Sequence, residues 1–262
     1  MSSHRNPRHN EERNIYCTVG LRLLECRPLS SPDIAHCPSS RRSPMFEIDL
    51  KKHRIVDLSY EVVPGESGDR PFVIQRGLLA DNAYKYDVTK THSHVGTHVE
   101  APAHFFDGGK DVTQLPLTAY FGRALLLEVH DAKATKAITA AYCQKTLGSL
   151  IRPGDIIICR NNDEASKKAG KDALPHLTPE SAEWMRDKKI KMLGVDNYVR
   201  LAKNIPEGRE LHDILMKHDI TFVEWLDNLA ALKRREFFFM ALPFKVRVMD
   251  SSWARAIAIE EI

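Results

Sequence analysis

The sequence has no long hydrophobic run, since no apolar stretch approaches the roughly 20 residues that span a bilayer. We therefore expect no membrane partner. The five cysteines include no Cys-x-x-Cys pair, and their odd number argues against a disulfide framework or a zinc ribbon. Reduced thiols in a cytoplasmic protein are the simplest interpretation.

The main part of the chain also lacks a net charge. Residues 1–44 hold seven arginines, no lysine and four acidic residues, whereas residues 45–262 carry 31 basic and 31 acidic side chains. A nucleic-acid-binding domain needs a basic face, so we expect no nucleic-acid partner. The alternative is a nucleic-acid-binding protein that uses its basic N-terminal arm, and salt-dependent binding lost on deletion of residues 1–44 would reveal it.

Residues 1–44 differ from the rest in composition. They are rich in Arg, Ser, Pro and Asn and have no sustained hydrophobic period, whereas Met45 opens a segment that resembles a natural protein start. We expect residues 1–44 to be a disordered or non-native extension and residues 45–262 to be the working domain.

From Met45 onwards the pattern predicts an α/β fold with a mixed sheet. Short continuous apolar runs are typical of strands buried on both faces. A helix is expected from Pro179, because Thr178 can cap it and proline suits the first helical position. The expected strands are His53–Ser59, Ala124–Val129, Asp155–Arg160, Ile190–Asp196, Thr221–Leu226, Phe237–Leu242 and Arg255–Glu260. The expected helices are Ala140–Leu150, Pro179–Lys188 and Glu210–His218, with Gly154, Gly194 and Gly208 at element boundaries.

The segment from His92 to Phe105 reads His-Ser-His-Val-Gly-Thr-His-Val-Glu-Ala-Pro-Ala-His-Phe and holds four histidines and one carboxylate. His94 and His98 have the spacing of a His-Glu-x-x-His helix, but Val95 stands in place of the glutamate. Gly96 and Pro102 make a regular helix improbable and favour an irregular loop.

In such a loop His94, His98 and Glu100 can converge as two imidazoles and one carboxylate. This ligand set leaves coordination positions open, as catalytic metal sites do. His104 is either a further ligand or a general base. A bound divalent ion lowers the pKa of water to about 7, which suits hydrolysis of an amide or ester by metal-activated water.

The run from His94 to Phe105 resembles the His-x-Gly-Thr-His-x-Asp-x-Pro-x-His-Phe signature of the cyclase family of metal-dependent hydrolases, which includes kynurenine formamidases and isatin hydrolases. Asp57–Ser59, Ala241–Pro243 and Asp250–Ala256 extend the resemblance to about residues 53–260. The resemblance implies a swivelling β/β/α single domain that assembles as a homodimer or homotetramer.

The resemblance also implies the roles of individual residues. His94, His98 and Glu100 would hold one metal ion, and Glu100 would bridge to a second ion held by His212 and Glu224. His104 would be the catalytic acid/base. Zn²⁺ or Mn²⁺, one or two ions per subunit, is the implied cofactor, and residue types alone do not choose between them.

Three departures from the family pattern concern the site. Glu100 stands where the family usually has Asp, which lengthens the reach of the carboxylate. The segment Tyr60–Phe72, where kynurenine formamidases place an aromatic substrate contact, contains no Trp. Trp253 stands where the family often has Pro.

The expected function is therefore hydrolysis of a small-molecule amide, lactam, lactone or ester. Arylformamidase activity on N-formylkynurenine, a step of tryptophan catabolism via kynurenine, is the best single named activity. The alternative within the family is a non-catalytic member that binds a metal or ligand.

Overall fold

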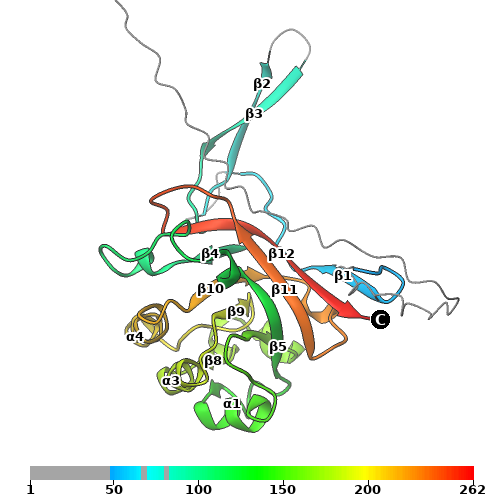
Figure 1. The fold of residues 1–262 in the computed structure, drawn as a ribbon, viewed down its shortest axis with the longest axis vertical. Helices are drawn as coiled ribbons and strands as arrows, with labels where there is room; N and C mark the ends of the chain where they lie inside the picture. The colour runs from blue at the N-terminus through cyan, green and yellow to red at the C-terminus, as the bar shows by residue number, and fades with distance from the viewer. Residues whose placement is uncertain (1–47, 66–69, 80–82) are drawn as a thin grey trace, which may run out of the picture. The chain divides into compact units, whose positions relative to one another are not determined.

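Eight strands of the described chain form one mixed sheet that closes on itself (Figure 1). The computed structural model describes residues 48–65, 70–79 and 83–262, and Ile48–Ile262 forms one compact unit. The strand order is β1-β12-β11-β5-β7-β9-β10-β4, and pairing of β4 with β12 closes the ring. Their bounds are His53–Asp57 (β1), His98–Glu100 (β4), Phe121–Val129 (β5), Ile156–Asn161 (β7), Met192–Asp196 (β9), Thr221–Leu226 (β10), Glu236–Pro243 (β11) and Ser251–Glu261 (β12).

The predicted α/β domain with a mixed sheet is confirmed. The pairs β5–β7, β7–β9 and β9–β10 are parallel, and the remaining pairs of the sheet are antiparallel. Successive side chains of a strand point to opposite faces. Leu126 accordingly joins the apolar cluster inside the ring, while Leu125 and Leu127 join the cluster that includes helix residues. Both faces of β5 are thus buried, as its continuous apolar run predicts.

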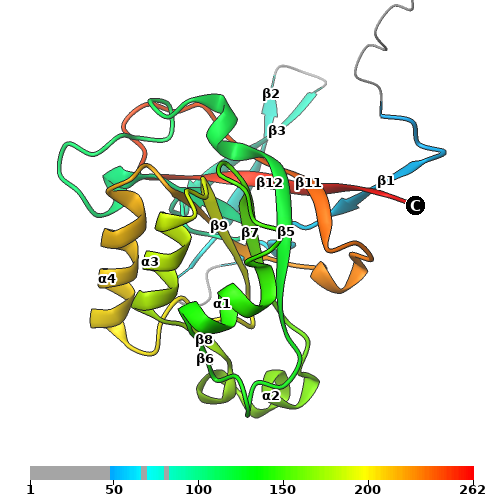
Figure 2. The same cartoon turned by 60° about the horizontal axis from the view of Figure 1, so that its bottom comes forward.

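Helices cover one side of the closed sheet (Figure 2). They are α1 (Ala140–Leu147), α2 (Glu164–Ala169), α3 (Pro179–Asp187) and α4 (Ile205–Met216). Of these, α1, α3 and α4 bury apolar side chains against the sheet, in the same cluster as Ile157 and Phe222. Two short strands, β6 (Ala137–Ile138) and β8 (His176–Leu177), pair with each other outside the main sheet.

The helix starts follow their capping residues. Thr178 caps α3 by accepting the backbone N–H of Ser181, as predicted. The predicted start of α4 at Glu210 is wrong, because Asn204 caps the helix and accepts the N–H of Glu207. Gly208 is therefore inside α4 and does not mark its boundary.

Two features of the fold were not expected from the sequence. β2 (Val73–Leu79) and β3 (Ala83–Lys90) form an antiparallel hairpin. β4 is only three residues long, yet it pairs on both sides, with β10 and with β12. Strand β4 carries His98 and Glu100 of the histidine-rich segment, so its two neighbouring strands determine which side chains lie beside these residues.

Gly194 lies inside β9, not at a boundary, and a side chain there has no space. A Cβ at this position would lie 2.4 Å from Ile158 Cδ1, whereas a Cβ at Gly208 would lie 3.7 Å from its nearest neighbour, Ala202. We expect Gly194→Ala to lower the free energy of unfolding by about 1–3 kcal/mol through overpacking. Gly208→Ala should raise it by about 0.5–1 kcal/mol through helix propensity. Urea unfolding measures both, and equal effects would contradict the packing argument.

The N-terminal segment lies outside the described residues. The predicted division between residues 44 and 45, and the predicted disorder of residues 1–44, therefore stay predictions. Among the described residues, no helix is long and apolar enough to cross a membrane.

Candidate metal centre

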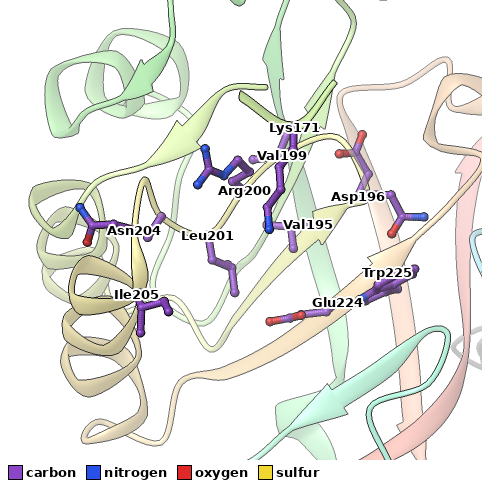
Figure 3. Close-up of a pocket in the computed structure, with 13 residues that line it drawn as sticks. Lys171, Val195, Asp196, Val199, Arg200, Leu201, Asn204, Ile205, Glu224 and Trp225 are labelled. Carbon is purple, nitrogen blue, oxygen red and sulfur yellow. The ribbon is translucent and has the colours of Figure 1, made fainter. Parts of the chain in front are cut away.

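A cavity of about 420 Å³ opens at the C-terminal ends of the parallel strands β9 and β10. Ligand sites of α/β sheets commonly lie at this edge. Asp196 and Glu224 both line it (Figure 3). Asp196 accepts the backbone N–H groups of Asn161 at 3.2 Å and Tyr198 at 2.8 Å, so it serves the turn after β9. Glu224 lines the cavity (Figure 3), and it also belongs with Glu100 and His212 to a group that could hold a metal ion.

Strand pairing brings Glu224 to that cluster. β4 and β10 are antiparallel, and His98 lies directly opposite Glu224. Glu100 is two residues beyond His98 and therefore points to the same face of the sheet. His98 is fully buried and Glu100 is 3% exposed. The register of one strand pair thus places an imidazole and two carboxylates together.

His94 joins them from the irregular loop that the sequence predicts before β4. Gly96 turns the chain with a φ of 66°, a conformation that glycine adopts readily. His94 Nδ1 lies 2.9 Å from Glu100 Oε1 and 3.2 Å from His98 Nε2, and His98 Nε2 lies 3.3 Å from Glu100 Oε1. Ligands about 2.1 Å from a tetrahedral ion are roughly 3.4 Å apart, so this spacing fits one metal ion.

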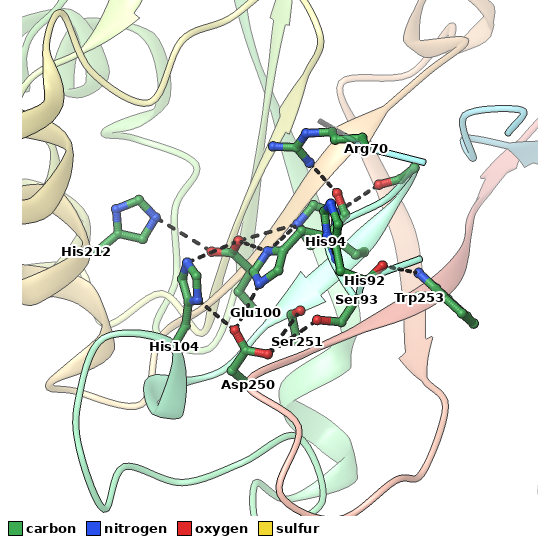
Figure 4. Close-up of polar contacts among 12 residues, drawn as sticks. Arg70, His92, Ser93, His94, Glu100, His104, His212, Asp250, Ser251 and Trp253 are labelled. Carbon is green, nitrogen blue, oxygen red and sulfur yellow. Dashed lines mark hydrogen bonds and ion pairs between the residues drawn. The ribbon is translucent and has the colours of Figure 1, made fainter. Parts of the chain in front are cut away.

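Each of three histidines has its outward ring nitrogen engaged by an oxygen that can only accept. His98 Nδ1 donates to Gly96 O at 2.8 Å, and His212 Nδ1 donates to Gly208 O at 2.6 Å. His94 Nε2 lies 2.9 Å from Asp250 Oδ2 (Figure 4). In the neutral rings the nitrogens that face the cluster therefore carry the lone pairs that metal ligation requires.

Glu100 connects the two halves of the cluster. Its Oε2 lies 3.6 Å from His212 Nε2. This carboxylate oxygen is buried and has no hydrogen-bond partner among the described residues. Burial alone would raise the pKa of Glu100, but the side chains of His212, His94 and His98 outweigh it and hold that pKa well below its usual value. A buried carboxylate with an unsatisfied oxygen is costly unless a cation compensates it.

A second group of potential metal ligands consists of Glu100, His212 and Glu224, whose ligand atoms lie within 4.8 Å of one another. His212 comes from α4, and its ring stacks on Phe222 at 4.5 Å, which fixes its orientation. Burial and the neighbouring Glu100 carboxylate raise the pKa of Glu224 to about 7. Two acids and a histidine are thus held close together, and these residue types fit a second divalent ion.

His104 lies beside the cluster at the end of a short 3₁₀ turn, Pro102–His104. Its Nε2 lies 3.8 Å from Glu100 Oε1, and its Nδ1 lies 2.7 Å from Asp250 Oδ2. Asp250 therefore holds both His94 and His104. No role was predicted for Asp250, although it opens the C-terminal segment that carries part of the resemblance.

The other histidines near the signature take different positions. His92 is exposed, and its carbonyl accepts the Nε1–H of Trp253 at 3.2 Å. His218 is exposed near the end of α4, with its Nδ1 3.0 Å from Ile214 O. Neither belongs to a group of described residues that could hold a metal ion.

Comparison with known proteins gives a matching family model, a relative in sequence and neighbours in structure. The Cyclase family model matches residues 36–199. Kynurenine formamidase from Bacillus mycoides is 29% identical over 197 residues, which cover 72% of this chain and 88% of that protein. Isatin hydrolase A from Ralstonia solanacearum has a similar structure, with a TM-score of 0.64, 21% identity and coverage of 79% of this chain and 92% of that one. Isatin hydrolase A from Labrenzia aggregata, bound to benzyl benzoate, also has a TM-score of 0.64, with 20% identity and coverage of 79% and 93%.

The structural neighbours share the fold, and the family model identifies the chain itself. The matched residues make up more than half of the 262-residue sequence and include the run from His94 to Phe105, while His212 and Glu224 lie beyond them. The chain belongs to the cyclase family.

Proposed function

We propose that this chain is a metal-dependent hydrolase that cleaves the C–N bond of a small-molecule amide or lactam. Arylformamidase activity on N-formylkynurenine is the named activity that we favour, because a kynurenine formamidase is among its relatives. The observation that carries the proposal is the buried Glu100 carboxylate between two groups of potential ligands.

The two described thiols, Cys143 and Cys159, are free and buried, which suits the proposed cytoplasmic location.

In this proposal His94, His98 and Glu100 would hold one ion, and Glu100, His212 and Glu224 would hold a second. Zn²⁺ and Mn²⁺ are the ions that we favour, since two or more imidazoles with carboxylates suit both. Such an ion supplies Lewis-acid polarisation of the scissile carbonyl and lowers the pKa of water.

Protein side chains carry out the proton transfers. His104 Nδ1 is engaged by Asp250, so its Nε2 is free to accept a proton from the attacking water. The same nitrogen can afterwards give that proton to the leaving amine. Asp250 keeps the imidazole in one tautomer and one orientation, as the acid does in a Ser-His-Asp triad.

Removal of metal should abolish hydrolysis. We expect a chelator-treated and dialysed enzyme to lose turnover of N-formylkynurenine by at least about 10³-fold, because the electrostatic stabilisation of the reacting carbonyl is lost. Addition of Zn²⁺ or Mn²⁺ should restore it, and elemental analysis gives the number of ions per subunit. Full turnover by a verified metal-free sample would refute the mechanism. Retained metal without turnover of amides or lactones would favour a non-catalytic member.

We also propose that the chain assembles as a homodimer or homotetramer through the β2–β3 hairpin, which extends from the sheet in Figure 1. An isolated two-stranded ribbon is marginally stable in water. Strand register puts Arg76 and five apolar side chains on one face of this hairpin, and those five are all exposed. They are Ile74, Leu78, Tyr84, Tyr86 and Val88. The opposite face carries Gln75, Gly77, Lys85 and Asp87, with Leu79 and Ala83 at the end of the ribbon.

A charged residue on the apolar face should therefore dissociate the assembly. Leu78 is 66% exposed and Tyr84 lies opposite it at 63% exposed. We expect Leu78→Asp combined with Tyr84→Asp to reduce the mass measured by light scattering to that of one subunit. Gln75→Glu on the polar face is the control and should leave the mass unchanged. A monomeric wild type, or an unchanged mass in the double variant, would contradict the proposed interface.

A further inference from the structure

Trp225 has a backbone conformation that tryptophan rarely adopts. Its φ is 57°, and the register of β10 with β9 shifts between Val223 and Leu226, as in a β-bulge. The left-handed region is unfavourable for residues with a bulky side chain. Strained residues of this kind cluster at functional sites, where bulges also re-aim side chains. Trp225 directly follows Glu224, and both line the cavity in Figure 3.

Three contacts hold this residue in place. Thr97 Oγ1 donates to the carbonyl of Trp225 at 2.6 Å. The ring of Tyr60 meets the indole edge-on with centroids 5.5 Å apart. The guanidinium carbon of Arg70 lies 4.8 Å from the centroid of the indole ring. Trp225 therefore supports the cationic side chain of Arg70. Arg70 belongs to the segment Tyr60–Phe72, which contains no tryptophan.

Arg70 is oriented towards the metal centre. One of its terminal nitrogens, Nη1, donates to the carbonyl of His94, and Figure 4 shows the side chain reaching across beside that residue. A guanidinium has five N–H donors. Among the described residues, one hydrogen bond, to the carbonyl of His94, engages these donors, and no carboxylate pairs with them.

We propose that Arg70, supported by Trp225, binds a carboxylate of the substrate beside the metal centre. Arginine stacked on an aromatic ring keeps its edge free, and that edge matches a carboxylate in a two-point contact. The inference rests on the proposed hydrolase function and adds a substrate class, namely amides or lactams whose scissile group lies near an anionic group. Trp225 acts through Arg70 and is a positioning residue.

Two other cations compete for this role. Lys171 and Arg200 line the same cavity as Glu224. Lys171 is exposed, and Arg200 Nη2 already donates to Lys203 O at 2.5 Å. Among the described residues, no hydrogen bond or ion pair joins either of them to the metal centre, whereas Arg70 donates to the carbonyl of His94. The experiment must therefore separate Arg70 from Arg200.

The test compares an acid with its neutral ester. N-formylanthranilate and its methyl ester are assayed with metal-loaded enzyme, and equilibrium binding of each is measured by calorimetry. Wild type should prefer the acid by roughly 10²-fold in kcat/KM, the scale of a desolvated charged hydrogen-bond pair. Arg70→Gln should remove most of this preference, mainly through KM, and Arg70→Lys should restore part of it. Arg200→Gln should retain the preference.

Trp225→Asn supplies a second readout, since asparagine tolerates the left-handed backbone. It should keep the wild-type metal content and lose acid preference, because Arg70 loses its support. Lys188→Gln is the matched control, since Lys188 lies 5.6 Å from the Trp184 ring, and it should change neither quantity.

Persistence of the acid preference in Arg70→Gln, or its loss only in Arg200→Gln, would overturn the proposal. An equal preference for acid and ester in wild type would also overturn it. If neither compound is hydrolysed, the hydrolase function is in doubt for these substrates, and the binding comparison still decides whether Arg70 selects the acid.

Discussion

Replacing His104 by alanine should reduce turnover by about 10²–10⁴-fold and leave the metal content unchanged. His104 is held by Asp250 through Nδ1, and its Nε2 lies 3.8 Å from Glu100 Oε1. This distance exceeds the 2.9 Å and 3.3 Å that separate Glu100 Oε1 from His94 and His98. The imidazole thus borders the ligand cluster at a place where it can exchange protons with substrate.

The control for this variant is His218→Ala. His218 is exposed near the end of α4 and belongs to no potential metal group among the described residues. It should keep both turnover and metal content. His94, His104 and Asp250 also form a group that could hold an ion. A parallel loss of metal and turnover in His104→Ala would therefore make His104 a ligand and contradict its role as acid/base.

Much of the sheet could be predicted from local sequence, because its strands are buried on both faces. The apolar runs at Leu125–Leu127 and Ile156–Ile158 have no solvent-exposed side chain in the structure. The β2–β3 hairpin gave no such signal, since Gln75, Arg76 and Gly77 interrupt its apolar residues and both faces are largely exposed. β4 is too short for any period to be recognised.

The residues of the candidate site also differ in how far the local sequence could predict them. His94, His98, Glu100 and His104 are close in sequence, so their spacing alone suggested a metal site. His212 and Glu224 reach the cluster only through α4 and the pairing of β10 with β4, and no local pattern encodes that pairing. They were identified through the family resemblance. Asp250 and Arg70 were missed because their roles depend on tertiary contacts with His94.

Replacing Glu100 by alanine should have the largest effect on metal content. Among the described residues, Glu100 is the carboxylate that belongs to both groups of potential ligands, and the change leaves His94, His98 and His212 without its charge. We expect loss of bound metal and a fall in turnover of about 10³-fold or more. Glu128→Gln is the control, because Glu128 pairs with Arg160 outside the potential metal groups. It should retain metal, and retained metal in Glu100→Ala would contradict the bridging role.

Glu100→Asp tests why this chain has a glutamate at a position where the family usually has an aspartate. Glu100 Oε1 lies 2.9 Å from His94 Nδ1 while Oε2 lies 3.6 Å from His212 Nε2, so the carboxylate already spans the gap between the two groups. Removal of one methylene withdraws it by roughly 1.5 Å, and one of the two contacts must lengthen. We expect one ion to be lost or weakened and turnover to fall by about 10–100-fold. Unchanged turnover with two bound ions would instead mean that β4 can shift towards α4, so that the backbone and not the longer side chain sets the separation of the two ions.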